Sequence, residues 1–184
     1  AAIRRSKGRI KPAQRKKELL GYIDQLFDIL DETYRDLYSV VPLTRAQVTA
    51  YTKQYFDFVS PDFVPMVVDE NDRMIAFGLV MPSMSRALQK SRGRIFPFGF
   101  VHLLRAMKNN ERADLYLIAV KPEYQGKGIN AVIMNHMLGV FQERGILVAE
   151  SNPELETNHL VQSQWKHFKT RQHKRRRCYI RELG

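Results

Sequence analysis

The segment AVKPEYQGKGINAVIMNHML, residues 119–138, limits the possible folds of this chain more than any other part of it. It passes from an apolar run through Pro122 into a basic turn with Gly126 and Gly128, and then into an amphipathic helical pattern. A glycine-containing turn that opens a helix is a typical anion site, because the first backbone N–H groups of a helix have no partners within it. The segment therefore predicts a phosphate-bearing ligand.

Two nucleotide-binding motifs compete for this turn. A Walker A loop needs four residues between its glycines and then Gly-Lys-Ser/Thr, and GKGIN has neither feature. The dinucleotide fingerprint G-x-G-x-x-A is matched by Gly126, Gly128 and Ala131, with Glu150 at the end of the next strand. However, KPEYQ separates Val120 from the first glycine, and the 34 residues after Glu150 are too few for the further βα units of that fold. The first motif is excluded and the second is disfavoured.

The order of predicted elements indicates a mixed α/β domain. Thr44 predicts a helix start, because Gln47 stands at the capping-box position. Gly145 predicts the end of the helix that follows the glycine turn. Spacing and turn residues predict the other elements: a helix from Pro12 to about residue 38, a hairpin over 63–83, helices over 83–93 and from Pro97, strands over 112–122 and 146–152, a helix over 155–168 and a final strand over 176–183.

Composition narrows the class of protein. The chain has 184 residues, of which 44% are hydrophobic, and this suits one domain with its own core. The single Cys178 excludes a disulfide framework, and the five histidines lack paired ligand spacing, so we expect no metal. No apolar run has the length of a membrane span and no signal-peptide pattern opens the chain, so we expect a cytoplasmic protein.

The net charge of +11 is concentrated at the two ends of the chain. IRRSKGRIKPAQRKK and KHFKTRQHKRRRCYIREL hold 16 of the 30 Lys and Arg residues. Such ends can bind nucleic acid, an anionic membrane or an acidic ligand, and two solvated charge runs explain them equally well. Nucleic acid is the weakest of these expectations.

Gln125 and Gly128, preceded by LYLIAVKPEY, match the pattern Arg/Gln-x-x-Gly-x-Gly/Ala, which resembles the acyl-coenzyme A loop of GNAT N-acetyltransferases. The predicted element order resembles that family over nearly the whole chain. The resemblance implies an α/β (α+β) fold: a mixed, mostly antiparallel sheet flanked by helices, with a splayed central strand pair. It also implies acetyl-CoA, or another acyl-CoA, as cosubstrate and an amine as the second substrate.

Further segments resemble the C-terminal half of longer bacterial GNAT-like proteins, namely NDRMIAFGLVMPS, FPFGFVHLLRAMK, NPELETN and RQHKRRRCYI. This implies that residues 1–184 form a single GNAT-like domain of a longer two-domain chain. Residues 1–12 would be a basic N-terminal segment or strand, and residues 170–184 a basic C-terminal strand. A missing N-terminal domain would be a partner.

The resemblance also assigns roles to residues that match the family pattern. The main chain of Ile118, Ala119 and Val120 is implied to bind the pantetheine arm, and Asn158 to face the cofactor. The backbone of the turn is implied to bind the pyrophosphate through Gln125, Gly126, Lys127, Gly128, Ile129 and Asn130.

The resemblance assigns catalytic roles less directly than binding roles. Asp114 occupies the position of a base early on the strand, and Glu150 at the end of the next strand is a comparable candidate. Seven residues after Asn158, where the family has a tyrosine that protonates the thiolate, stands Trp165, whose indole is no practical proton source. Two hypotheses therefore stand. The protein transfers an acetyl group to a primary amine by direct attack in a ternary complex, or it is a non-catalytic CoA-binding or interaction module.

Overall fold

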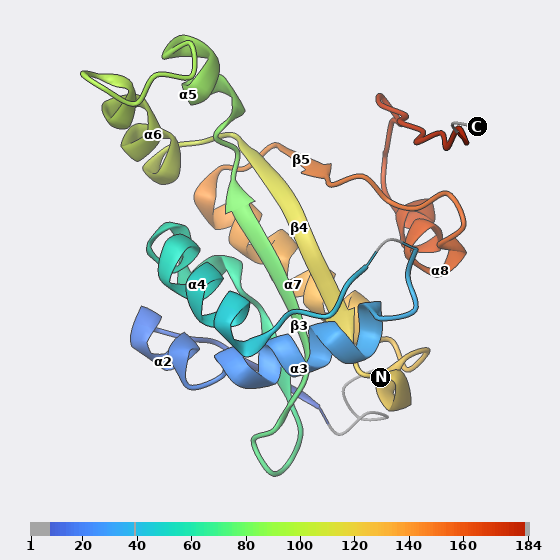
Figure 1. Cartoon of the computed structure of the whole chain (residues 1–184). Helices are drawn as coiled ribbons and strands as arrows, with labels where there is room; N and C mark the ends of the chain where they lie inside the picture. The colour runs from blue at the N-terminus through green and yellow to red at the C-terminus, as the bar shows by residue number, and fades with distance from the viewer. Residues whose placement is uncertain (1–7, 39, 183–184) are drawn as a thin grey trace. The chain divides into compact units, whose positions relative to one another are not determined.

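β3 (Met74–Pro82) and β4 (Arg112–Val120) are the two long strands at the centre of a five-stranded sheet (Figure 1). The structure is a computed structural model, and it describes residues 8–38 and 40–182. The chain divides into two compact units, Ala1–Glu150 and Ser151–Gly184, and the sheet is built on the first. The other helices and strands are β1 (Arg9–Lys11), α2 (Lys16–Leu20), α3 (Ile23–Tyr34), α4 (Arg45–Tyr55), β2 (Met66–Val68), α5 (Ser85–Lys90), α6 (Gly99–Lys108), α7 (Ile129–Arg144), β5 (Val148–Ser151) and α8 (His159–Ser163).

The strand order in the sheet is β1-β2-β3-β4-β5. The first four strands pair antiparallel with their neighbours, and β2 and β3 form the hairpin predicted around residues 70–72. β4 and β5 are joined through α7, which is the crossover connection that parallel neighbours need. The sheet is therefore a mixed one, as the sequence predicted.

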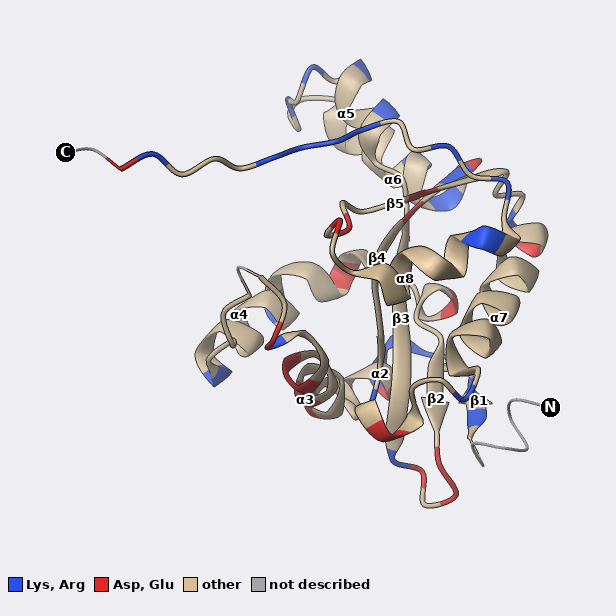
Figure 2. Ribbon diagram, turned by 90° about the vertical axis from the view of Figure 1, so that its right-hand side faces the viewer, with Lys and Arg blue, Asp and Glu red and all other residues tan. Residues whose placement is uncertain are grey.

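Helices cover both faces of the sheet. Figure 2 shows α3 and α7 on opposite sides of it. On one face Ile29 of α3 packs with Phe77 of β3, and on the other Ile129 and Ile133 of α7 pack with Ile75. β3 is buried along most of its length because it is covered from both sides. The two cores fix the position of the β4 end and of the α7 start.

α7 packs closely on the sheet because of one glycine. Its buried residues Ile129, Ile133 and Met137 recur every fourth position and form one stripe. Gly78 of β3 faces this stripe, and a Cβ there would lie 3.2 Å from Ile133 Cγ2 and 3.0 Å from Pro65 Cγ. Glycine at residue 78 thus permits the close approach of helix and sheet.

Most helix ends follow the sequence prediction. Thr44 and Gln47 form the predicted capping box of α4, and Gly145 ends α7 with φ 67°. The single helix predicted from Pro12 to about residue 38 is wrong, since α2 and α3 are separate. The Gly21 N–H donates to the Glu18 carbonyl in a tighter turn, which ends α2 after one turn and a half.

The second unit contains α8 and the 3-10 turn η4 (Gln164–His167), followed by chain without helix or strand to residue 182. The strand predicted over 170–184 is therefore wrong for its described residues. Tyr179 and Ile180 are 85% and 88% exposed, so no apolar face is buried that would fix a strand. Four consecutive cations, 174–177, precede them, and their repulsion favours solvated chain.

Candidate functional site

The glycine turn leaves the first N–H groups of α7 without partners in the helix. Gly126 and Gly128 have φ of 70° and 82°, which glycine adopts without strain. Gly128 is the N-cap and has no side chain to accept from the first turn, where the N–H groups belong to Ile129, Asn130 and Ala131. These three donors and the helix dipole form an environment that favours an anion.

Lys127 adds a positive charge beside these donors. Its side chain is exposed, and its Nζ lies 5.3 Å from the ring centroid of Tyr124 in the preceding 3-10 turn η3 (Pro122–Tyr124). A cation over an aromatic face is attracted by the ring quadrupole. The contact restrains the ammonium near the rim of the turn.

The last residues of β4 direct their backbone groups alternately to the two sides of the strand. The Lys121 N–H donates to the Ile75 carbonyl, so Ala119, two residues back, also faces β3. Ile118 and Val120 therefore direct their N–H and C=O groups to the opposite edge. This separates the three residues predicted to bind pantetheine, because the Ala119 backbone is committed to the sheet and the other two are not.

Two side chains contact this outer edge. The Tyr34 hydroxyl of α3 donates to the Ile118 carbonyl at 3.0 Å, and the Gln125 amide donates to the Val120 carbonyl at 3.0 Å. Both bonds use carbonyl oxygens, so the N–H groups of Ile118 and Val120 are the donors that the edge offers. Tyr34 was missed by sequence reasoning because 84 residues separate it from Ile118.

β5 is too short to cover this edge. The Leu147 and Val148 N–H groups donate to the Glu111 carbonyl at 2.8 and 3.1 Å, so β5 starts level with the start of β4. Four residues extend about 13 Å at about 3.3 Å each, whereas Val120 lies nine residues beyond Glu111. The end of β4 therefore projects past β5.

β4 carries a bulge at Tyr116. Leu117 pairs with Leu79 and Leu115 pairs with Val80, which leaves Tyr116 between them without a partner in the register. Bulges redirect side chains and occur often next to active sites. Tyr116 is 41% exposed, and its pKa is raised, first by burial and then by the nearby Asp114 carboxylate. The phenol is therefore neutral across the physiological pH range.

The other predicted site residues lie as follows. Asp114 is half-buried on β4, opposite Met81 of β3, and Glu150 is half-buried on β5. Asn158 belongs to the second unit and caps α8, where its Oδ1 accepts from the Val161 N–H at 3.3 Å. The structure thus brings the turn and the β4 end together, places Asp114 further along β4, and gives Asn158 a capping role.

Trp165 is held within the second unit. Its Nε1–H donates to the two carboxylate oxygens of Glu154 at 2.8 and 3.1 Å, and its ring lies edge-on to Phe168 with centroids 6.1 Å apart. An indole engaged in this way is a structural anchor. The geometry gives no proton-donor function to the residue that replaces the expected tyrosine.

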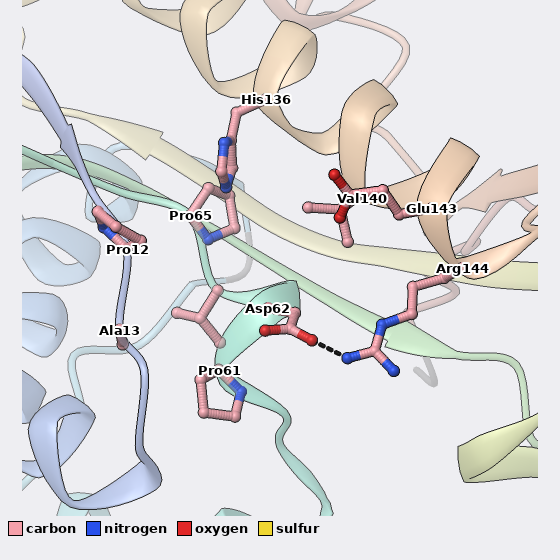
Figure 3. Close-up of a pocket in the computed structure, with 10 residues that line it drawn as sticks. Pro12, Ala13, Pro61, Asp62, Pro65, His136, Val140, Glu143 and Arg144 are labelled. Atoms are coloured by element: carbon pink, nitrogen blue, oxygen red, sulfur yellow. Dashed lines mark hydrogen bonds and ion pairs between the residues drawn. The ribbon is translucent and has the colours of Figure 1, made fainter.

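Two cavities lie away from the glycine turn. One, of about 430 Å³, is lined by His136, Glu143 and Arg144 of α7 and by η2 (Pro61–Phe63) (Figure 3). The other, of about 500 Å³, lies at α5 and α6. In the described part of the chain no three potential ligands among His, Cys, Asp and Glu gather as a metal site would require. None of the helices described has the length and apolar character needed to cross a bilayer.

A family model described as "Acetyltransferase (GNAT) family" matches residues 23–160, which is more than half of the chain. The chain belongs to the GNAT acetyltransferase family. Its curated relative Protein YghO of Escherichia coli strain K12 is 25% identical over 164 residues, which cover 86% of this chain and 42% of YghO. This GNAT chain thus spans less than half the length of that relative.

Solved structures share the GNAT fold at low sequence identity. An aminoglycoside acetyltransferase, meta-AAC0020, from an uncultured soil metagenomic sample has a TM-score of 0.57 and 12% identity, over 98% of this chain and 99% of that one. The Escherichia coli ribosomal-protein-S18-alanine N-acetyltransferase has a TM-score of 0.52 and 12% identity, over 84% and 72%. PH1933 of Pyrococcus horikoshii OT3 has a TM-score of 0.56 and 17% identity, over 86% and 85%. These likenesses confirm the predicted fold.

Proposed function

We propose that this GNAT-family protein binds an acyl-CoA at the glycine turn and the β4 edge, and transfers the acyl group to a primary amine. The observation that carries the proposal is the continuity of two donor sets. The N–H groups at the start of α7 and those of Ile118 and Val120 lie on either side of one short turn, residues 121–128. The first set suits a pyrophosphate and the second an amide-rich arm.

The residues present fit the donor molecule. The pyrophosphate would accept from the N–H groups of Ile129, Asn130 and Ala131, and the left-handed glycines allow the backbone to approach it. Lys127 would add one charge, and Gln125 would keep the turn joined to β4 through the Val120 carbonyl. The pantetheine amides would extend along the edge that β5 leaves uncovered.

The transfer would proceed by direct attack. The ammonium form of the substrate first loses a proton to Asp114, directly or through one water, and the lone pair of the resulting amine then forms a bond to the thioester carbonyl carbon. Backbone N–H groups of the β4 edge would stabilise the negative oxygen. The C–S bond breaks, the departing thiolate takes a proton, and the nitrogen releases its second proton to solvent to give the neutral amide. Glu150 is the alternative base.

Tyr116 is our candidate for the proton donor to the thiolate. It lies at the bulge, two residues from Asp114, and its raised pKa keeps it protonated. A neutral phenol can donate one proton and recover it from solvent. Trp165 cannot replace it, because an indole does not release its proton to a thiolate and its N–H contacts Glu154.

Isothermal titration with acetyl-CoA and a thiol-release assay against a panel of primary amines test the proposal. Gly128→Val should abolish binding, because a β-branched residue at φ 82° strains the turn and blocks the approach to the donors. Gly139→Val is the matched control on the same helix, where a Cβ meets nothing within 4 Å. Equal acetyl-CoA affinity in the wild type and Gly128→Val would refute the turn assignment.

A second candidate function is a non-catalytic CoA-binding or interaction module. The contact of Trp165 with Glu154 favours it, because the position of the usual catalytic tyrosine is occupied by a structural anchor. Tight CoA binding without thiol release from acetyl-CoA, over the whole amine panel, would support this function and exclude transfer to those amines.

A further inference from the structure

Among the charged residues that line the cavity at α5 and α6, cations outnumber carboxylates. It has a volume of about 500 Å³, within the range of small-molecule sites. Arg86 and Lys90 of α5 line it together with Arg105 of α6 and Arg144 at the end of α7, and Glu111 is the single carboxylic residue in the lining. The segment 83–110 that supplies both helices has six Lys and Arg residues and no Asp or Glu.

This concentration of charge on exposed side chains is mildly unfavourable in the absence of an anion. Arg86 and Lys90 stand four residues apart, so they share one face of α5, and like charges at that spacing destabilise a helix. Arg105 lines the same cavity from α6. In the described residues no ion pair joins Arg86, Lys90 or Arg105 to a carboxylate.

Helix-end electrostatics explain only part of the pattern. Lys90 and Arg105 lie in the last turns of α5 and α6, where the helix dipole favours cations. Arg86 is the second residue of α5, and the dipole disfavours a cation there. A negative ligand in the cavity accounts for all three positions.

Arg144 contributes less than the other cations to this cavity. Figure 3 shows its guanidinium directed to Asp62, with which it forms an ion pair on the side of the other cavity. The lining is held in place by Asn110, whose side-chain amide donates to the Ser83 carbonyl at 2.6 Å and whose Oδ1 accepts from the Arg112 N–H at 3.0 Å. The hydrogen bonds of Asn110 therefore fix the polar part of the lining without using the side chains of Arg86, Lys90 or Arg105.

We propose that this cavity binds a multiply charged phosphate anion, held by Arg86, Lys90 and Arg105. The site is separate from the glycine turn. Arg144 and Gly145 lie at the far end of α7, whose 16 residues span about 24 Å from the first turn. Its ligand is a soluble polyphosphate or the phosphorylated headgroup of a lipid, which share this chemistry.

The loop between α5 and α6 exposes apolar side chains, and this is a reason to test a lipid headgroup separately from a soluble phosphate. Ile95, Phe96 and Phe98 are 52%, 78% and 72% exposed in a segment whose only charges are positive. Figure 1 shows the α5–α6 pair at one end of the first unit, next to the start of β4. Exposed aromatic side chains beside basic residues favour the interface of an anionic bilayer.

Isothermal titration with sodium tripolyphosphate tests the site on the full chain. Arg105→Glu should weaken binding about tenfold or more, because a charge-assisted contact is replaced by repulsion. Lys108→Glu makes the same change of net charge on an exposed residue of α6 that does not line the cavity, and it should stay within about twofold of wild type. If Arg105→Glu does not fold, Arg86→Ala takes its place as the test, and Arg94→Ala, at a residue outside the lining, is its control.

Where tripolyphosphate does bind, two results would overturn the proposal. The first is equal weakening of tripolyphosphate binding by Arg105→Glu and Lys108→Glu, or by the second pair, since this indicates only long-range charge. The second is loss of the binding under saturating CoA, since this places the anion at the glycine turn. An undiminished affinity with CoA present supports two sites, and it does so whether or not the protein transfers acyl groups.

Vesicles distinguish the two sources of phosphate. Phosphatidylcholine vesicles with phosphatidylinositol bisphosphate are compared with vesicles that lack it, using wild type, Arg105→Glu and Phe98→Ala. A lipid headgroup predicts binding that both variants weaken, while Phe98→Ala leaves tripolyphosphate affinity unchanged. A soluble ligand predicts Arg105-dependent tripolyphosphate binding without vesicle binding. Absence of binding to tripolyphosphate and to both kinds of vesicle refutes the site.

Discussion

The hydroxyl of Tyr34 donates a 3.0 Å hydrogen bond to the carbonyl oxygen of Ile118, which joins α3 to the outer edge of β4. The bond connects a core helix to the end of the strand that forms part of the proposed acyl-donor site. It satisfies an acceptor that β5 is too short to reach. The position of α3 and the geometry of the site are thus coupled.

Tyr34→Phe should lower the free energy of unfolding by about 1 kcal/mol, because the Ile118 carbonyl loses its partner in a partly buried place. Thermal unfolding measures this loss. Tyr38→Phe, at a residue that is 71% exposed, is the control and should stay within about 0.5 kcal/mol. If acetyl-CoA binds along β4, its Kd should also rise in Tyr34→Phe and not in the control. Equal stability of the two variants would contradict the structural role.

Asp114→Asn should lower kcat/KM for the amine by about 10²–10⁴, because an amide cannot accept the ammonium proton. Acetyl-CoA affinity measured by titration should be unchanged. Glu150→Gln is the comparison that decides between the two candidate bases. A large loss in Glu150→Gln with an active Asp114→Asn would transfer the role to Glu150.

Tyr116→Phe tests the proton donor and has its own pH signature. A raised pKa means that the phenol stays protonated up to and beyond its ordinary pKa of 10.0. At pH values below 10.0, wild-type turnover should therefore not decrease for lack of this proton. Activity that depends on the phenol proton should fall only as pH rises through the raised pKa of Tyr116. Chromatographic detection of CoA from pH 7 to 11 measures the profile. An identical alkaline limb in Tyr116→Phe would exclude the phenol.

The sequence predicted the segment around the glycine turn well, because local chemistry determines it. Pro122, Gly128 and Gly145 fix the ends of their elements through backbone constraints that do not depend on distant residues. The bulge at Tyr116 and the bond from Tyr34 depend on pairings with β3 and α3, and no local pattern encodes them. The alternating roles of Ile118 and Ala119 likewise follow from sheet register alone.

The incorrect predictions have physical causes of the same kind. Apolar residues continue at helical spacing through Gly21, but the Gly21 and Tyr22 N–H groups donate to carbonyls three residues back and so end α2. The apolar pair Tyr179 and Ile180 suggested a strand, but a strand forms only where a neighbour accepts its backbone bonds, and the sequence names no such neighbour. The cofactor contact expected of Asn158 stays a prediction, and its side chain caps α8.

Asp72 connects the β2–β3 turn to the N-terminal strand, and this should make stability depend on pH at both ends of the scale. Its carboxylate pairs with Lys11 and Arg9 and accepts from the Tyr22 hydroxyl at 2.5 Å. The Lys11 and Tyr22 hydrogen bonds lower the pKa of Asp72 from its ordinary 3.8, and Asp72 in turn raises the pKa of Lys11 above 10.5. The lowered pKa of Asp72 gives stability that is present above pH 3.8 and lost as pH falls through the folded value.

The raised pKa of Lys11 works in the opposite direction, with stability present below 10.5 and lost as pH rises through the folded value. Melting temperatures of wild type and Asp72→Asn should therefore differ near neutral pH and converge at both extremes. Asp69→Asn serves poorly as a control because Asp69 caps the same turn, so Asp36→Asn on an exposed position is used. A difference that stays constant from about pH 2 to 11 would contradict the charge contribution.

Two glycines at and near the end of α7 should respond with opposite signs to the same substitution. Gly139 and Gly145 both have open space where a Cβ would project, so neither change creates a clash. Gly139 is inside the helix without a positive φ, and alanine there should stabilise the protein by about 1 kcal/mol through helix propensity. Gly145 has φ 67°, and alanine there should cost about 1–2 kcal/mol. Melting temperatures should move apart by about 4–12 °C between the two variants, given about 2–4 °C per kcal/mol at this size. A shift of the same sign in both would show that steric space, and not the backbone angle, governs this helix end.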